Sequence, residues 1–269
     1  MLRGAVCALR SLLCALKQNR GARLAVRKLS EPIAGVYLRM PPLESCPAWL
    51  GLASDIAVPA AARRARAPER TAAGGANINI ILHLLDETRC VPGDIVECGV
   101  FRGRTIIPIG LYARRAAPEK QVLGFDSFDG FEDHAVREEI ALGGSADRDK
   151  RLGGFAETSY AEVQRKVRRL GLAGRVQLVP GLFEHSLPRF EERQFSFIHL
   201  DCDLYQSYKT CLEFFYPRTK LGGIVLLDEY NDPPWPGCNL AVDEFLHDKP
   251  ETLFEIERDN YRKWFFRKL

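Results

Sequence analysis

Short apolar runs alternate with segments of helical periodicity from about residue 71 to the end of the chain. The apolar runs predict buried strands at 94–100, 121–125, 175–179, 195–200 and 222–227. The periodic segments predict helices at 71–90, 103–115, 159–170, 206–215 and 241–246. The last two segments, 252–257 and 263–267, are expected to form an antiparallel pair. Strands that alternate with helices predict a doubly wound α/β sheet.

Two of the apolar runs, both within residues 195–230, end in carboxylates. Asp201 and Asp203 follow the first run, and Asp228 and Glu229 follow the second. Parallel strands bring such residues to the carboxyl edge of a sheet, where ligands of open α/β folds bind. Four acids that converge there repel one another unless a divalent cation lies between them. The sequence therefore predicts a metal site at this edge.

Two other segments lack the pattern of a packed core. Residues 31–70 are rich in proline and carry the tract A-A-R-R-A-R-A, and residues 132–155 are polar and rich in glycine. We expect the first to be an arm that precedes the folded domain and the second to be a mobile lid. The predicted organisation is a basic helix and a Pro/Ala/Arg-rich arm at 1–70, followed by one domain at 71–269.

The first 30 residues have a helical, amphipathic pattern with seven Lys or Arg residues and no acid. Three interpretations stay open: a surface helix that packs on its own domain or on the partner of a homodimer, a transit peptide, or a membrane-surface helix. No apolar span reaches about 18 residues, so no membrane-crossing helix is expected. We expect a cytoplasmic protein, with organelle targeting or membrane-surface binding as the alternative.

Composition and cysteine usage further narrow the class of protein and the compartment in which it functions. The formal net charge of +3 over 269 residues gives no indication of nucleic-acid binding. The eight cysteines show no C-x-x-C and no paired spacing, and several lie inside apolar runs. This usage indicates reduced, structural thiols in a reducing compartment rather than disulfides or a zinc site.

The first strand leads into V-E-C-G-V-F-R-G, which places Gly99 and Gly103 after an acid, Glu97. Glycine is needed where the backbone approaches a ligand closely. The pattern is not G-x-G-x-x-G, and an acid before the glycine repels a pyrophosphate, so a dinucleotide is disfavoured. An acid there suits a ligand with a cationic end, such as S-adenosylmethionine. Asp126, at the end of the second strand, is placed to accept hydrogen bonds from ribose hydroxyls.

Several motifs of this chain together resemble those of the macrocin O-methyltransferase (TylF/MycF-like) family. They are V-E-C-G-V-F-R-G, F-D-S-F-D-G-F, V-P-G-L-F-E-H-S-L-P, F-I-H-L-D-C-D-L-Y-Q-S-Y-K-T, L-G-G-I-V-L-L-D-E-Y and W-P-G-C-N-L-A-V-D-E-F. They span about residues 94–245 in the order of the family. The combination of D-x-D-L-Y with W-P-G-C-x-x-A-V-D-E-F is specific, whereas single motifs are not.

The resemblance implies a Rossmann-like class I methyltransferase fold, with a mostly parallel seven-stranded sheet and an antiparallel C-terminal strand. It implies S-adenosylmethionine and Mg²⁺ as cofactors, and methyl transfer to a hydroxyl of a small acceptor, a glycosylated metabolite of natural-product biosynthesis. The implied cofactor-binding residues are Glu97, Gly99, Gly103, Asp126, Ser127, Phe128, Gly181 and Phe183. The implied metal ligands are Asp201, Asp228 and Glu229, and Asp203 is the implied general base. The family usually has aspartate at the position of Glu229, whose longer arm shifts the geometry.

A sugar hydroxyl has a pKa far above neutral, so a hard cation that holds vicinal hydroxyls, with a carboxylate beside it, makes its deprotonation feasible. A catechol or another vicinal diol satisfies the same chemistry, so the acceptor stays open. Two alternative functions are a D-x-D metal-dependent glycosyltransferase and a non-catalytic methyltransferase-fold binding subunit. The glycosyltransferase does not explain Glu97 and Asp126, and the retention of Asp201, Asp203 and Asp228 argues against a scaffold.

Three further features each have two interpretations. His199 lies within the fourth strand and is interpreted as a buried structural histidine rather than a base. His134 is interpreted as a solvated lid residue, with an approach to the acceptor as the alternative. The aromatic segment Tyr230–Trp235 is interpreted as a packed loop, with stacking on a sugar ring as the alternative.

Overall fold

The computed structural model describes residues 73–144, 155–258 and 261–269 of the chain. The predictions made for residues 1–70, and for the part of the expected lid at 145–154, lie outside these ranges. Among the described helices, none has both the length and the apolar character that a membrane crossing requires.

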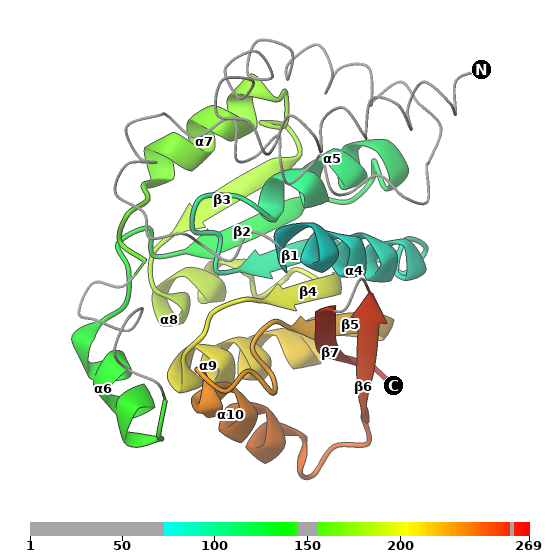
Figure 1. Cartoon of the computed structure of the whole chain (residues 1–269). Coiled ribbons are helices and arrows are strands. Elements are labelled where there is room, and N and C mark those ends of the chain that lie inside the picture. Colours follow the sequence, from blue (N-terminus) through cyan, green and yellow to red (C-terminus); the bar gives the residue numbers. More distant parts are fainter. Residues whose placement is uncertain (1–72, 145–154, 259–260) are drawn as a thin grey trace.

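One seven-stranded sheet runs through the described part of the chain (Figure 1). Its strands are β1 (Asp94–Cys98), β2 (Val122–Asp126), β3 (Val176–Pro180), β4 (Phe195–Leu200), β5 (Thr219–Leu227), β6 (Leu253–Arg258) and β7 (Tyr261–Arg267). Their order is β3-β2-β1-β4-β5-β7-β6. The pairs among β1 to β5 are parallel, and β7 is antiparallel to both β5 and β6. The predicted sheet, including its antiparallel C-terminal strand, is confirmed.

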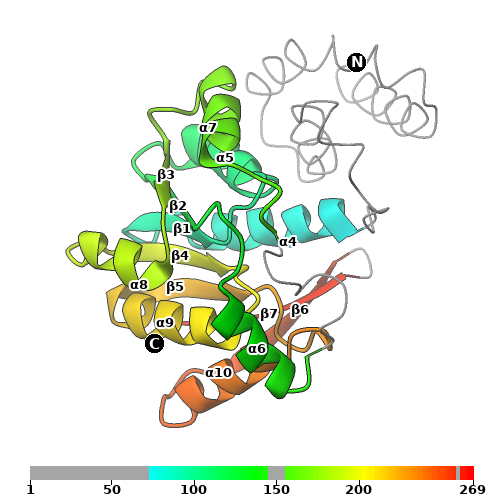
Figure 2. The same ribbon diagram turned by 90° about the vertical axis from the view of Figure 1, so that its left-hand side faces the viewer.

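Helices cover both faces of the sheet (Figures 1 and 2). On one face lie α4 (Ala73–Glu87), α5 (Ile106–Ala116) and α7 (Tyr160–Arg169), and on the other lie α8 (Phe183–Ser186), α9 (Tyr205–Phe215) and α10 (Pro236–Leu246). Two short 3₁₀ turns, Leu187–Phe190 and Tyr216–Arg218, follow α8 and α9. Each face has its own apolar core, and β4 is buried along its whole length between them. A central parallel strand is buried on both faces, which is why four of the six residues of β4 are apolar.

The expected lid contains a helix that the sequence pattern did not predict. This helix, α6 (Asp133–Ala141), stands at the carboxyl-end side of the parallel strands, next to α9 (Figures 1 and 2). The interpretation of residues 132–155 as too polar for the core is wrong at two positions, because Val136 and Glu139 are buried. The two residues are three positions apart and therefore lie on the same side of the helix. The burial of Glu139 could not be predicted from the sequence, because an acid counts as a polar position in the pattern.

The observed starts of two helices also differ from the first residues of the predicted segments. The second predicted helix begins at Ile106 rather than Gly103. Residues 241–246 do belong to a helix, which begins earlier, at Pro236. Proline suits a first helical position, because it has no N–H to leave unpaired there. Ser159 caps the start of α7: its Oγ accepts a hydrogen bond of 3.3 Å from the backbone N–H of Glu162.

Candidate active site

A cavity of about 370 Å³ opens at the carboxyl edge of the sheet. Residues at or just beyond the ends of four neighbouring strands line it, namely Gly99, Asp126, Gly181, Asp201 and Asp203. The topology explains this meeting, because parallel strands end at the same edge. The cavity size suits a bound small molecule, and its mixed lining offers both apolar and polar contacts.

Asp126 ties together the loops that follow β1 and β2. Its Oδ2 accepts hydrogen bonds from the backbone N–H groups of Val100 and Phe101, each at 2.7 Å, and its Oδ1 accepts one from Phe128 at 2.6 Å. A carboxylate has about four lone-pair positions, so these three bonds leave one acceptor position on Oδ1. The side chain lines the cavity and therefore fixes the loops while keeping some capacity to accept from a ligand.

The predicted cofactor-binding residues divide into two groups. The residues that line the cavity are Gly99, Asp126, Ser127, Gly181 and Phe183. The residues that do not are Glu97, Gly103 and Phe128. Phe128 instead packs edge-on against Tyr160, with ring centroids 5.7 Å apart. A Cβ on Gly103 would lie 2.9 Å from Val163, so this glycine lets the loop approach α7. For these two residues a direct cofactor contact stays a prediction.

The four predicted acids gather at one place. Asp201, Asp228 and Glu229 each offer a carboxylate oxygen within 4.8 Å of the others. Asp203 follows a turn: its φ is +60°, and its backbone N–H donates to Glu229 Oε2 at 3.3 Å. β4 ends at Leu200, so Asp201 and Asp203 both lie beyond the strand, and both line the cavity.

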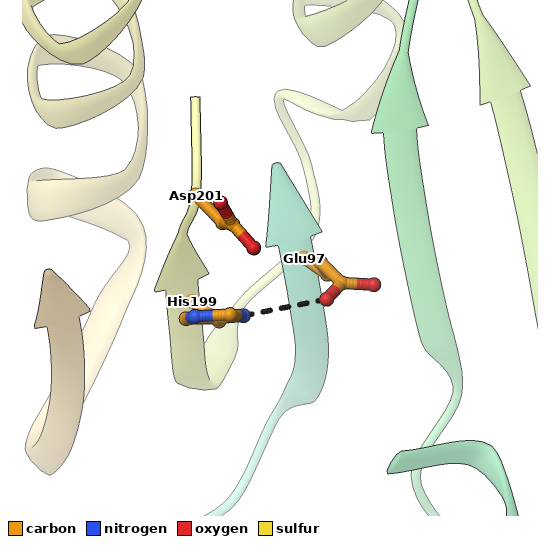
Figure 3. A group of neighbouring side chains, drawn as sticks. All are labelled: Glu97, His199 and Asp201. Carbon is orange, nitrogen blue, oxygen red and sulfur yellow. Dashed lines mark hydrogen bonds and ion pairs between the residues drawn. The ribbon is translucent and has the colours of Figure 1, made fainter. Parts of the chain in front are cut away.

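A chain of polar contacts crosses the sheet beneath these acids. Glu97 Oε1 lies 3.3 Å from His199 Nδ1, and His199 Nε2 lies 3.2 Å from Asp228 Oδ1. Figure 3 shows Glu97 on β1 joined to His199 on β4, with Asp201 beyond the end of the same strand. On the far side, Lys263 Nζ lies 2.6 Å from Asp228 Oδ2. The strand register accounts for this order, since Glu97 pairs with His199 and the β5–β7 register places Asp228 opposite Lys263.

The charges in this chain are set by burial and by the neighbouring groups. Burial alone would lower the pKa of His199, but its hydrogen bonds to Asp228 and Glu97 outweigh that effect and raise the pKa to about 10. His199 is therefore a cation at neutral pH. Burial would raise the pKa of Asp228, but the charge of Lys263 and the contacts with His199 hold it below its usual range. His199 is confirmed as a buried histidine, and its contacts place it directly behind the acid cluster.

Glu229 is held by groups that an aspartate at this position would not reach in the same way. Its Oε2 accepts a hydrogen bond of 2.6 Å from the hydroxyl of Tyr208, which lies on α9 and is fully buried. Burial raises the pKa of Glu229, and the charges of Asp203 and Asp201 raise it further. The longer side chain thus fits a site in which a tyrosine anchors it. Its role as a metal ligand stays a prediction.

Three residues of the site were not predicted from the sequence. Lys263 and Tyr261 come from β7, and Tyr261 lines the cavity. Asn77, on α4, donates to Asp228 Oδ1 at 3.2 Å and also lines the cavity. The only signal for Lys263 was a lysine inside an aromatic strand, Y-R-K-W-F-F. The antiparallel register that brings it to Asp228 is a long-range property, which the sequence pattern does not contain.

His134 and the aromatic segment 230–235, each of which had two interpretations from the sequence, take different positions. His134 is exposed on α6 and lines the cavity, so it is both solvated and close to the ligand space. The segment 230–235 contributes nothing to the cavity lining. Instead the Tyr230 hydroxyl donates to Asp243 at 2.7 Å, and buried Trp235 packs edge-on against Phe131. In the structure this segment is a packed loop.

Glu139 fastens α6 to the rim of the site. Its Oε2 accepts from the backbone N–H of Tyr205 at 3.2 Å, and its Oε1 accepts from that of Gly237 at 2.9 Å. These N–H groups belong to the first turns of α9 and α10, so one buried carboxylate caps two helices. The favourable interaction with both helix dipoles adds to this effect.

We expect Glu139→Ala to lower the free energy of unfolding by about 2–3 kcal/mol, because two caps are lost and two N–H groups are left without an acceptor. Urea unfolding measures this change. Glu138→Ala is the matched control, because Glu138 is exposed on the same helix, and its effect should stay within about 0.5 kcal/mol. Equal midpoints for the two variants would show that the double cap does not stabilise the fold.

Comparisons with known proteins identify the family of this chain. The profile of the macrocin-O-methyltransferase (TylF) family matches residues 76–268. Demethyldecarbamoylnovobiocin O-methyltransferase of Streptomyces niveus is 34% identical over 173 residues, which are 63% of this chain and 64% of that protein. Mycinamicin III 3''-O-methyltransferase of Micromonospora griseorubida is 31% identical over 177 residues, 62% of this chain and 66% of that protein. The chain thus spans a little under two thirds of the length of these curated relatives.

Solved structures show the same fold. The O-methyltransferase NovP is 29% identical and superimposes with a TM-score of 0.60, covering 71% of this chain and 79% of NovP. The calicheamicin methyltransferase CalS11 is 24% identical, with a TM-score of 0.61 and coverage of 71% and 78%. The family match includes every strand of the sheet and all the acids of the cluster. The chain belongs to the macrocin O-methyltransferase (TylF) family.

Proposed function

We propose that this chain is an S-adenosylmethionine-dependent O-methyltransferase that methylates a hydroxyl of a sugar or another vicinal diol with the help of Mg²⁺. The observation that carries the proposal is the meeting of two sets of residues in one cavity. Gly99 follows β1 and Asp126 is the last residue of β2, whereas Asp201 and Asp203 come from the loop after β4. The relatives support the same class, since they are named as O-methyltransferases and one is named for the 3''-hydroxyl of mycinamicin III.

The donor set fits a magnesium ion. Three carboxylates, those of Asp201, Asp228 and Glu229, offer oxygens within 4.8 Å of one another, and oxygen ligands are those that Mg²⁺ prefers. A second group, Glu97, His199 and Asp201, also lies within that distance. It suits the ion less well, because His199 is held as a cation between two acids and has no free lone pair. When bound at the carboxylate set, Mg²⁺ supplies Lewis acidity to a hydroxyl of the acceptor.

The cofactor side of the cavity fits a sulfonium nucleoside. Asp126 keeps an acceptor position for a ribose hydroxyl, and Ser127, Gly181 and Phe183 line the same region. Glu97 is fully buried, and its Oε2 has no hydrogen-bond partner among the described residues. Burial raises the pKa of this carboxyl, and the contact with His199 opposes that rise. In its ionised form the carboxylate would favour a cationic end of the cofactor nearby. S-adenosylmethionine supplies the methyl group that is transferred.

Asp203 is the proposed general base. It lines the cavity, and its backbone is turned away from the strand direction by its positive φ, whereas Asp201 belongs to the carboxylate set. The two acids of D-C-D thus have separate tasks: Asp201 holds the metal, and Asp203 accepts the proton of the acceptor hydroxyl as the methyl group is transferred. The fixed loops hold the two reactants in line, and such positioning lowers the barrier further.

We expect S-adenosylhomocysteine to raise the melting temperature of the protein, and a nucleotide-sugar to leave it unchanged, because only the first matches the Gly99 and Asp126 side of the cavity. A screen of glycosylated metabolites and catechols with labelled S-adenosylmethionine should then give methyl transfer that is lost with EDTA and restored by Mg²⁺. Thermal shift and label incorporation are the two measurements. No shift with S-adenosylhomocysteine and no label on any diol would refute the proposal.

A further inference from the structure

Lys263 is a buried cation in the acid cluster that the proposed reaction does not use. Only 4% of the residue is exposed, and its Nζ lies 2.6 Å from Asp228 Oδ2 and 4.9 Å from the ring centre of Tyr261. Lysine is seldom buried unless it is paired, and a buried ammonium holds its partner strongly. The ion pair between Lys263 and Asp228 is therefore an integral part of the site.

The other oxygen of Asp228 is also occupied. Its Oδ1 accepts from Asn77 Nδ2 at 3.2 Å and lies 3.2 Å from His199 Nε2. Asp228 is thus contacted by three side chains from three different elements, namely α4, β4 and β7. Both of its oxygens therefore have close neighbours, and Oδ2 is the one that Lys263 holds. A metal ion bound at Asp228 shares this carboxylate with the ammonium group.

We propose that Lys263 is a built-in counter-cation for the acid cluster: it holds Asp228 when no metal is bound and weakens the binding of a divalent cation there. The proposal rests on the metal site of the proposed function. Two cations that share one carboxylate repel each other across a short distance, and the buried surroundings screen this repulsion poorly. Removing the ammonium charge therefore strengthens metal binding. It also leaves Asp228 with one cation fewer, which destabilises the metal-free protein.

The test compares Lys263→Met with the wild-type full-length chain by calorimetric titration with MgCl₂ and by thermal unfolding in EDTA. We expect the Kd for Mg²⁺ to fall at least tenfold, the melting temperature in EDTA to fall, and the stabilisation by saturating Mg²⁺ to grow. Lys268→Met is the matched control, because Lys268 pairs with Glu251 at 3.0 Å, away from the acid cluster. It should change the melting temperature without changing the Kd.

The outcomes separate the two proposals. If the wild type binds Mg²⁺ and folded Lys263→Met binds it equally or more weakly, the counter-cation role is refuted and the metal site stands. If neither protein binds Mg²⁺, both the metal site and the role of Lys263 fall. If Lys263→Met binds Mg²⁺ and the wild type does not, the counter-cation role of Lys263 is supported most strongly. Lys263→Gln, which keeps a donor but loses the charge, gives the same comparison if the methionine variant does not fold in EDTA.

Discussion

Asp203→Asn is expected to lower kcat by about 10²–10⁴-fold while the affinity for S-adenosylhomocysteine stays unchanged. The amide cannot accept the proton of the acceptor hydroxyl, but it has nearly the shape of the carboxylate. Asparagine also tolerates the positive φ of +60° at this position, so the turn and the N–H bond to Glu229 should persist. The loss is therefore chemical rather than structural.

Single-turnover transfer of a labelled methyl group measures the effect directly, and titration with S-adenosylhomocysteine measures cofactor binding on the same sample. Asp248→Asn is the control, because Asp248 is exposed and pairs with its neighbour Lys249 at 2.7 Å, away from the cavity. A kcat for Asp203→Asn within about tenfold of the wild type would assign the proton to another group. His134, which lines the same cavity, would be the next candidate.

Local patterns in the sequence were enough to predict the parallel part of the sheet. Each central strand is a short apolar run buried on both faces, as β4 is at Phe195–Leu200, and such runs stand out between polar segments. The acids at their ends follow directly, because a parallel strand order brings all carboxyl ends to one edge. Asp201 and Asp228 therefore lie together in the structure as the sequence led us to expect.

Contacts that depend on long-range pairing could not be predicted in this way. Lys263 reaches Asp228 through the antiparallel register of β7 on β5, and nothing in the local sequence fixes that register. Glu139 is similar: it reads as one of several acids on a polar segment, yet it is buried because two helix N-termini converge on it. In both cases a charged residue is buried by a partner far away in the sequence, so a pattern of polar and apolar positions misassigns it.

The loop after β1 and the loop after β4, which carries Asp201 and Asp203, are also coupled through the backbone, at Gly99. Its φ is +91°, and its N–H donates to the carbonyl of Phe125 at 2.9 Å. A Cβ built on Gly99 would lie 1.6 Å from the carbonyl oxygen of Asp201. The loops after β1 and β4 are therefore in direct contact at this point. A side chain at Gly99 must displace the segment that carries both acids of D-C-D.

Gly99→Ala is accordingly expected to lower the free energy of unfolding by about 2–5 kcal/mol, from the overlap with Asp201 and from the left-handed backbone conformation that alanine disfavours. Any folded fraction should also lose methyl transfer, since Asp201 and Asp203 would move together. Urea unfolding and labelled-methyl transfer are the measurements. Gly174→Ala is the control, because a Cβ there meets nothing within 4 Å, and its stability should change by less than about 1 kcal/mol. A Gly99→Ala protein as stable and active as the control would show that the two loops are not coupled through this contact.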